Sequence, residues 1–420
     1  MNYYLYIIYP VFFFFLFLIT KEKRKHPVYT GILIMYLLST VTTCLMLNEI
    51  IDKSPGNVRP NLFAIVYHCV MFWLLLTPFK SFDKYRFKAI GNIDGQWLSI
   101  FTIYIVFFCV CSLIDNIPKI NLGVLMADVQ ELRTMLEQIE YTNLSLMDHI
   151  VGFAQMYGAP AMALAFYNMI YHPEKKWLIF LLLICSAITP ISGMKYAARE
   201  YLIKYLFTFI IVYLLTKDKL PKVHQRGIYK LMIAIGVLFV SFFVIISFLR
   251  FGGSGNDGSN VISSLLVYFS EGFAFFSAFF TEFPNGLSGG SRTFPVLFGN
   301  SSIGAFRMND HVITDLQLNM FNTTVGSFVT DMGVVATVFV VIIYRLMFTF
   351  IGKLNFTVFT LTYMIWCYEF IFSALFFHNF TLSSARLLSI LMIVFFDFAT
   401  RGDIVNRKPN KYRKTRIYKC

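Results

Sequence analysis

The sequence predicts an all-α, polytopic integral membrane protein, a bundle of about 11 transmembrane helices with one large outer loop. Of its 420 residues, 57% are hydrophobic and 14% are charged, whereas soluble domains carry roughly 25% charged residues. The apolar residues also gather in runs long enough to cross about 30 Å of hydrocarbon. We therefore expect a single transmembrane domain over residues 1–420 and no soluble domain.

The first apolar run covers residues 3–20 and is followed directly by the basic segment KEKRK. It has no small-residue cleavage pattern, so we interpret it as a spanning helix rather than a removed signal peptide. Further runs along the chain meet the same length criterion. The predicted spans are 3–20, 28–47, 61–79, 97–114, 150–171, 177–193, 197–216, 228–249, 325–344, 354–377 and 383–400.

The distribution of Lys and Arg predicts that the N-terminus lies outside and the C-terminus inside. With this orientation the cytoplasmic connections hold 24 Lys and Arg, including eight in the basic tail 401–420, and the opposite side holds 11 in longer loops. Cytoplasmic loops of membrane proteins are enriched in these two residues. We interpret the cytoplasmic tail as a topology determinant, with binding to anionic lipid as the alternative.

Two outer segments have the pattern of amphipathic helices. In the outer loop 115–149, Leu125, Val129, Leu132 and Leu136 follow helical spacing beside acidic residues. In the large outer loop 250–325, residues 261–280 are half apolar. A further crossing there would move the basic tail outside, so we predict a helix lying flat in the outer interface.

Five cations on the predicted outer side are candidates for binding phosphate or pyrophosphate. Lys195 and Arg199 are four residues apart at the start of a span, so on a helix they face the same way. Arginine suits bidentate contact with phosphate and stays charged when partly buried. The alternative for each residue is a side chain that snorkels to the membrane surface. The other three candidates are Arg250, Arg292 and Arg307.

A histidine and two intramembrane residues are candidates for proton transfer. His311 lies between Asp310 and Asp315 in the large loop and is a candidate general base, although a loop histidine that is simply solvated is the alternative. Glu369 and His68 lie inside predicted spans. They indicate a proton or substrate path, or an internal ion pair, with Lys204 as the partner of Glu369. His378 and Arg386 beside the last outer turn are weaker candidates.

The sequence contains no P-loop, D-x-D or H-E-x-x-H motif. These absences disfavour nucleotide-driven and zinc chemistry. Seven cysteines are present without a C-x-x-C pair, so neither a disulfide framework nor a zinc site is predicted. We expect no metal site and no cofactor.

Two stretches carry a resemblance to a known family. ISGMKYAARE (residues 191–200) is similar to a Ser/Thr-Gly-x-basic pattern that opens a span, and FNTTVGSFVTDMG (residues 321–333) to an Asn-Thr-rich stretch that leads to Asp-aromatic-Gly. With its many spans and large outer loop, the chain resembles the Wzy-type O-antigen and oligosaccharide repeat-unit polymerases. It departs from them at Met332, which replaces the aromatic residue, and at Lys195, where arginine is typical.

The resemblance implies a membrane glycosyltransferase of the bacterial cytoplasmic membrane. It would join undecaprenyl-pyrophosphate-linked oligosaccharide units into a surface polysaccharide, a capsule or lipopolysaccharide, without metal or nucleotide sugar. The implied partners are these lipid-linked substrates, membrane lipids and other assembly proteins such as a chain-length regulator, but no nucleic acid. A flippase for the same lipids and an O-antigen ligase are the alternatives.

The resemblance also implies residue roles. Lys195, Arg199 and Arg250 would hold a pyrophosphate at the membrane surface. Arg292 and Arg307 would bind the second carrier or the sugar. His311, or failing it Asp331, would take the proton of the acceptor.

Overall fold

The protein, analysed as a computed structural model, is helical over the residues that the structure describes, and no strand occurs among them. These residues are 3–20, 25–52, 60–93, 95–119, 146–194, 199–230, 259–282, 288–298, 323–376 and 382–406, with short pieces at 232–233, 236–237, 241 and 286. The α-helices are α1 (Ile8–Ile19), α2 (Pro27–Leu45), α3 (Leu47–Asp52), α4 (Leu62–Leu76), α5 (Gln96–Asn116), α7 (Leu146–Ala154), α8 (Gly158–Tyr171), α9 (Lys176–Ser186), α10 (Ile188–Met194), α11 (Arg199–Thr216), α13 (Ser259–Phe279), α14 (Pro295–Phe298), α16 (Thr323–Met332), α17 (Val334–Ile351), α18 (Val358–Ser373) and α19 (Ser384–Asn406). Short 3-10 helices include η1 (Tyr3–Ile7), η3 (Thr77–Phe87) and η6 (Gln155–Tyr157).

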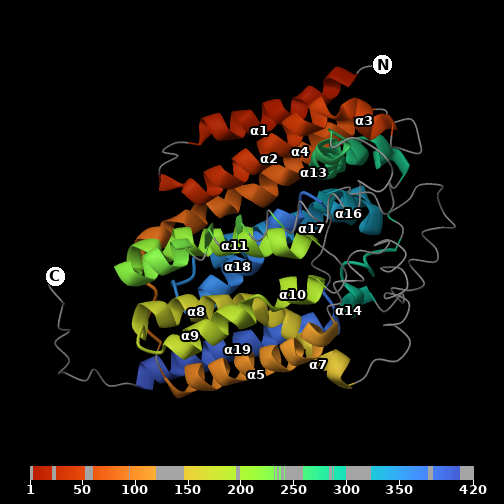
Figure 1. The fold of residues 1–420 in the computed structure, drawn as a ribbon. Coiled ribbons are helices and arrows are strands. Elements are labelled where there is room, and N and C mark those ends of the chain that lie inside the picture. The colour runs from red at the N-terminus through yellow and green to blue at the C-terminus, as the bar shows by residue number, and fades with distance from the viewer. Residues whose placement is uncertain are drawn as a thin grey trace.

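The long helices form a bundle in which two groups flank a central layer (Figure 1). One group contains α1, α2, α4 and α13, and the other contains α5, α8, α9 and α19. Between them α17 contacts α4, and α18 contacts both α8 and α11. The short helices α3, α7, α14 and α16 lie at one end of the bundle, here called the α14 end, and α8 and α9 are joined at the opposite end.

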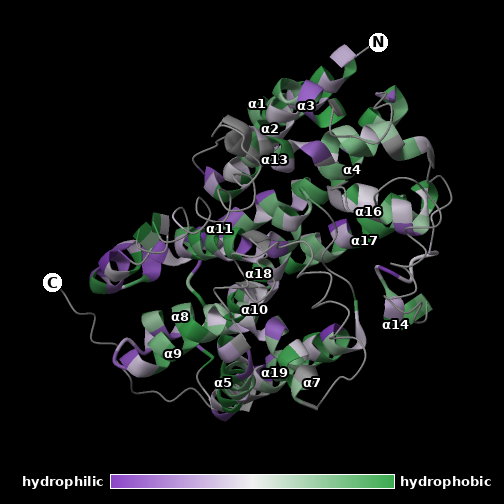
Figure 2. Ribbon diagram, turned by 45° about the vertical axis from the view of Figure 1, so that its right-hand side comes forward, coloured by the Kyte–Doolittle hydropathy of each residue, from purple (hydrophilic) through white to green (hydrophobic). Residues whose placement is uncertain are grey.

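Six of the described helices are long and apolar enough to cross a membrane: Pro27–Leu45, Leu62–Phe87, Gln96–Asn116, Ile150–Tyr171, Lys176–Gly193 and Val334–Ile351. Shorter apolar helices cover Tyr3–Ile19, Leu266–Ala278 and Val358–Ser373. Figure 2 shows hydrophobic residues along these helices and hydrophilic ones near the connection between α8 and α9. This pattern indicates a multi-pass membrane protein, while the number of about 11 spans and their orientation stay predictions.

The prediction of one continuous span over 325–344 is wrong. The structure ends α16 at Met332 and begins α17 at Val334, with Gly333 between them at φ 85°. A left-handed backbone conformation interrupts a helix, and glycine adopts it without steric cost. The run therefore belongs to two helices, and the long apolar one is Val334–Ile351. Hydropathy alone does not register this break, because Gly333 lies inside an apolar stretch.

The helix predicted over residues 261–280 is present as α13, and it packs into the bundle wall. Ser39 and Thr43 of α2 donate hydrogen bonds to the carbonyls of Phe269 and Ser270, at 2.6 and 2.8 Å. Phe273 is fully buried. The apolar side of this helix is therefore covered by protein, and its depth in the membrane stays a prediction. The amphipathic helix predicted within 115–149 lies mostly outside the described residues, as does the predicted span 228–249.

A buried carboxylate from η3 caps the start of α2. The two oxygens of Asp83 accept hydrogen bonds from the backbone amides of Val28 and Tyr29, at 3.1 and 3.0 Å. The first amides of a helix have no partner within it, and a negative charge there also interacts favourably with the helix dipole. Asp83 thus joins the end of the α4–η3 segment to the beginning of α2.

Replacing Asp83 by alanine should lower the free energy of unfolding by about 1.5–3 kcal/mol, because two buried amides lose a charged acceptor. Thermal unfolding of the purified protein in detergent measures the change. Asp218→Ala is the matched control, since the exposed Asp218 forms a surface ion pair with Arg86 at 3.3 Å, and such pairs contribute little. Equal loss in both variants would contradict the capping role of Asp83.

Candidate functional site: a charged pocket near the α14 end

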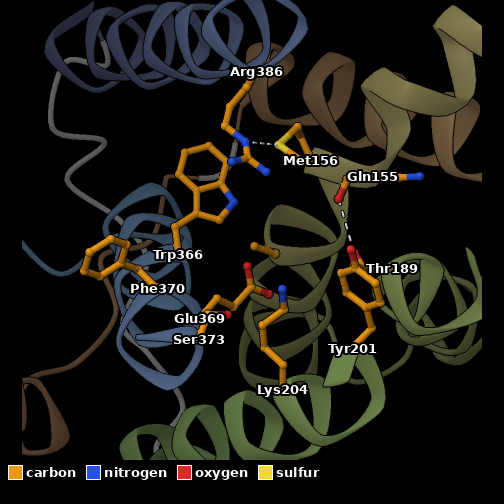
Figure 3. A pocket seen from close by; sticks show the side chains of 11 residues that line it. Gln155, Met156, Thr189, Tyr201, Lys204, Trp366, Glu369, Phe370, Ser373 and Arg386 are labelled. Atoms are coloured by element: carbon orange, nitrogen blue, oxygen red, sulfur yellow. Dashed lines mark hydrogen bonds between the residues drawn. The ribbon is translucent and has the colours of Figure 1, made fainter. Parts of the chain in front are cut away.

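A polar pocket lies among α8, α10, α11, α18 and α19 (Figure 3). Its lining mixes charged, amide, hydroxyl and aromatic side chains within an otherwise apolar bundle. The pocket therefore places polar chemistry where most helix positions carry hydrocarbon. The lining residues are Gln155, Met156, Ala159, Thr189, Tyr201, Lys204, Trp366, Glu369, Phe370, Ser373 and Arg386.

The pocket residues lie within about two turns of helix ends that meet at the same side of the bundle. Ala159 is near the beginning of α8, Lys204 near that of α11 and Arg386 near that of α19, whereas Glu369 is near the end of α18. Because neighbouring helices run in opposite directions, these ends come together toward the α14 end (Figure 1). The bundle topology thus assembles one site from residues far apart in the sequence.

Glu369 points into the pocket from α18 (Figure 3). Its side chain is half-buried, and the described part of the chain offers its carboxylate no hydrogen bond or direct ion pair. A carboxylate withdrawn from water without a partner costs several kcal/mol unless something compensates it. Glu369 is therefore available to a group that enters the pocket.

Lys204 reaches the same space from α11 (Figure 3). The residue is only 9% exposed, and its ammonium lies 4.8 Å from the centre of the Tyr201 ring, a cation–π contact. Over the described residues it forms no direct ion pair with Glu369, so the internal pair considered from the sequence is not made by contact. The two opposite charges share a pocket with space between them.

Arg386 enters the pocket from α19, on the side opposite Lys204 (Figure 3). Its Nε donates to the sulfur of Met156 at 3.1 Å, a weak acceptor. A guanidinium has five N–H donors, so it can bind several acceptors at once. Two cations of the pocket thus face a single carboxylate.

The remaining lining gives the pocket an aromatic and an amide side. Trp366 lies one turn before Glu369 on α18, so both side chains face the same way. Gln155 donates to the hydroxyl of Ser192 at 3.3 Å, and its backbone carbonyl accepts from Thr189 at 3.2 Å. These bonds orient the beginning of η6 against α10. The pocket can bind a ligand that combines an anionic group with hydroxyls and a flat apolar face.

Asp331 holds a turn at the α14 end. It is fully buried, and its carboxylate accepts hydrogen bonds from the amides of Arg292 and Thr293, at 3.4 and 2.8 Å, and from the hydroxyl of Ser288. Its backbone carbonyl accepts from the amides of Ser288 and Gly290, at 3.2 and 3.3 Å. The carboxylate is thus engaged in fixing residues 288–293. This geometry gives Asp331 a positioning function, and its predicted function as a base stays untested.

A close backbone crossing supports the same arrangement. Gly286 has φ +75°, and a Cβ on this residue would lie 2.5 Å from the amide nitrogen of Gly333. Only glycine fits both the conformation and the approach. Gly286 therefore lies directly against the junction between α16 and α17.

The structure describes only part of the predicted phosphate and proton-transfer residues. Lys195, Arg250, Arg307, His311 and His378 lie outside the described residues. Arg199 begins α11, but its side chain is outside the described part. Arg292 is exposed in the turn held by Asp331. Among the described residues, Arg292 does not line the pocket.

His68 is an internal hydrogen-bonding residue rather than a part of the pocket. It is fully buried in α4, with Nδ1 3.0 Å from the hydroxyl of Tyr9 and Nε2 2.9 Å from that of Thr323. Thr323 begins α16 with φ 66°, which is strained for a residue with a branched side chain. His68 thus helps to hold the start of α16. It does not line the pocket, so the pocket adds no proton-transfer partner to it.

The sequence pointed separately to Glu369, Lys204 and Arg386, and the structure brings them together. Trp366 and Tyr201 were missed, because aromatic residues are common throughout this chain. One local signal was present: Trp366 precedes Glu369 by three residues, the spacing of neighbours on one helix face. Among the described residues, no three His, Cys, Asp or Glu side chains are grouped to hold a metal ion.

Replacing Asp331 by alanine should speed trypsin cleavage after the exposed Arg292 by about 10- to 100-fold, because the turn loses charge-assisted bonds worth about 1.5–3 kcal/mol. A digestion time course followed by mass spectrometry measures this rate. Cleavage after Arg226, which is exposed in the helix of residues 222–230, is the internal control and should not change. An unchanged rate at Arg292 together with lost activity would favour the function as a base instead.

Comparisons with known proteins assign no function to this chain. No family model, curated protein or solved structure matches the chain. The charges, aromatic rings and position of the pocket therefore carry the assignment, together with the motifs in residues 191–200 and 321–333.

Proposed function

We propose that this protein joins lipid-linked oligosaccharide units into a polysaccharide at the outer face of the bacterial cytoplasmic membrane. The units would be carried on undecaprenyl pyrophosphate. The observation that supports this function most is the pocket near the α14 end, where Lys204 and Arg386 face Glu369 beside Trp366. Such a substrate needs an anion site and a sugar site, and the lining residues suited to each are neighbours there.

The two cations suit the pyrophosphate of a lipid carrier. In the transfer reaction the carrier leaves as a pyrophosphate, so negative charge develops on its oxygens. Preorganised cations in a site with little water stabilise such charge strongly, and arginine can contact two phosphate oxygens at once. Lys204 and Arg386, which both line the pocket, would supply this stabilisation.

The aromatic and amide residues suit the sugar. A pyranose presents a face of C–H groups that packs on an aromatic ring, and its hydroxyls both donate and accept hydrogen bonds. Trp366 offers such a ring, while Glu369 and Gln155 offer hydrogen-bonding groups. A ligand with both a pyrophosphate and a sugar would therefore use the whole lining.

The position of the pocket also favours transfer at one membrane face. It lies toward the α14 end, which contains α7, α14 and α16 and which the distribution of Lys and Arg assigns to the outside. Arg199 at the start of α11, with Lys195 and Arg250, would extend the anion site, and Arg292 and Arg307 would bind the second substrate. His311 belongs to the same predicted outer loop.

A flippase for the same lipids is the second candidate, because Glu369 and Lys204 lie within helices and ionisable residues there often mark transport paths. A flippase must offer its polar path to both membrane faces. The pocket is instead built from helix ends at one side of the bundle, which favours the polymerase over the flippase.

Deleting the gene should collapse the surface polysaccharide ladder to carrier or core bearing a single unit, because export would continue without polymerisation. Gel electrophoresis of the polysaccharide from the deleted and the complemented strain measures this. Loss of every rung, with lipid-linked units retained on the cytoplasmic side, would support the flippase instead.

Lys204→Ala and Arg386→Ala should each slow polymerisation about 10- to 100-fold, since each removes a charge-assisted contact worth about 1.5–3 kcal/mol. Polymer formed per unit time by purified protein, with lipid-linked oligosaccharide extracted from the deletion strain, measures the effect. Lys222→Ala and Arg226→Ala are charge-matched controls, since both residues are exposed outside the pocket. Full turnover in the two pocket variants would show that this pocket does not bind the pyrophosphate.

A further inference from the structure

We propose that Glu369 is the general base of the transfer reaction and accepts the proton of the attacking sugar hydroxyl. This inference rests on the proposed polymerase function and assigns the base to a different residue from His311 or Asp331, which the sequence suggested. It follows from the surroundings of Glu369 in the pocket, compared with those of the other buried carboxylates.

The carboxylates within the described helices differ in whether the protein itself supplies them with hydrogen bonds. Asp83 accepts two backbone hydrogen bonds, Asp331 accepts one at 2.8 Å from Thr293, and Asp397 accepts two from Arg401 at 3.0 and 2.8 Å. Each of these charges is compensated by the protein itself. Over the described residues Glu369 has no such bond, and it faces the pocket. Its acceptor oxygens are therefore free for a donor on a ligand.

Burial disfavours the ionised form of Glu369, and the positive charges in the pocket oppose this effect. Lys204 and Arg386 line the same pocket, so the carboxylate lies in a positive field without being consumed by a direct ion pair. A base must be ionised before reaction and must reach the proton that it removes. A carboxylate held in an ion pair with a guanidinium, as Asp397 is with Arg401, would be ionised. It could not reach the proton of a substrate, because the guanidinium occupies its oxygens.

Trp366 places the acceptor hydroxyl near this carboxylate. A sugar ring packed on the indole extends along the α18 face, and the next polar group on that face is Glu369, one turn further along the helix. Lys204 lies beyond this carboxylate, and Arg386 lies on the opposite side of the pocket, beside Trp366 (Figure 3). The pocket thus brings an aromatic ring, a carboxylate and two cations together around one space.

The step itself is balanced. The hydroxyl oxygen of the acceptor sugar forms a bond to the anomeric carbon of the growing chain, and the bond between that carbon and the pyrophosphate oxygen breaks. The leaving pyrophosphate takes the electron pair, and Lys204 and Arg386 stabilise the added charge. The hydroxyl proton moves to Glu369, which later releases it to water. No oxidant, reductant or further reactant is required.

The other candidates for a base are occupied. Asp331 accepts hydrogen bonds from the turn at 288–293, and both ring nitrogens of His68 lie within hydrogen-bond distance of hydroxyls inside the bundle. Withdrawing either would break structural contacts at each turnover. Glu369 can bind and release a proton without disturbing any hydrogen bond of the described protein.

The test compares Glu369→Gln with Glu369→Asp and with the control Glu174→Gln, an exposed residue in the connection between α8 and α9. The assay uses purified full-length protein and the lipid-linked oligosaccharide fraction from the deletion strain. We expect polymer formation to fall at least 100-fold in Glu369→Gln, since general bases typically contribute 10²–10⁴-fold. Glu369→Asp should retain part of the activity, and Glu174→Gln should equal the wild type.

A binding measurement separates loss of chemistry from loss of the site. Polyprenyl pyrophosphate should raise the unfolding temperature of Glu369→Gln at least as much as that of the wild type, because the two cations remain and ligand binding stabilises the folded state. Wild-type turnover in Glu369→Gln, or a lost thermal shift, would overturn the assignment. If the wild type makes no polymer, the proposed function itself fails.

Discussion

The cost of burying charge in an apolar bundle governs how the polar groups of this protein are arranged. A charged group withdrawn from water is tolerated only when hydrogen bonds or an opposite charge compensate it. Asp83 meets this condition by capping α2, and Asp331 meets it by holding the turn at residues 288–293. Both bonds join segments that are distant in sequence, so these charges also stabilise the tertiary structure.

Glu369 and Lys204 satisfy the same condition in another way. They share a pocket with Arg386, and their charges compensate one another through space rather than by contact. Space between opposite charges is costly in a folded bundle, because a direct ion pair or an apolar pair would be more stable. A ligand that bridges the charges removes this cost, and an oligosaccharide pyrophosphate has the groups to do so.

Part of the fold was predictable because its signals are local. Apolar runs located helices from residues 3–20 to 197–216, and their composition indicated a membrane bundle. The span over 325–344 was wrong, since a single glycine at φ 85° ends α16 and no hydropathy value records a backbone angle. The helix at 261–280 was expected from its periodicity, but its packing against α2 depends on contacts with distant residues such as Ser39.

The sequence by itself determined the class of protein, most of the helices and the identity of three ionisable residues that a membrane helix would not carry without cause. These follow from length, hydropathy and charge, which are properties of short stretches. Only the tertiary structure decided that Glu369, Lys204 and Arg386 face one pocket beside Trp366, whereas Asp331 and His68 are bound within the protein. The physical reason is that helix packing sets which faces of α11, α18 and α19 meet, and this depends on every neighbouring helix at once.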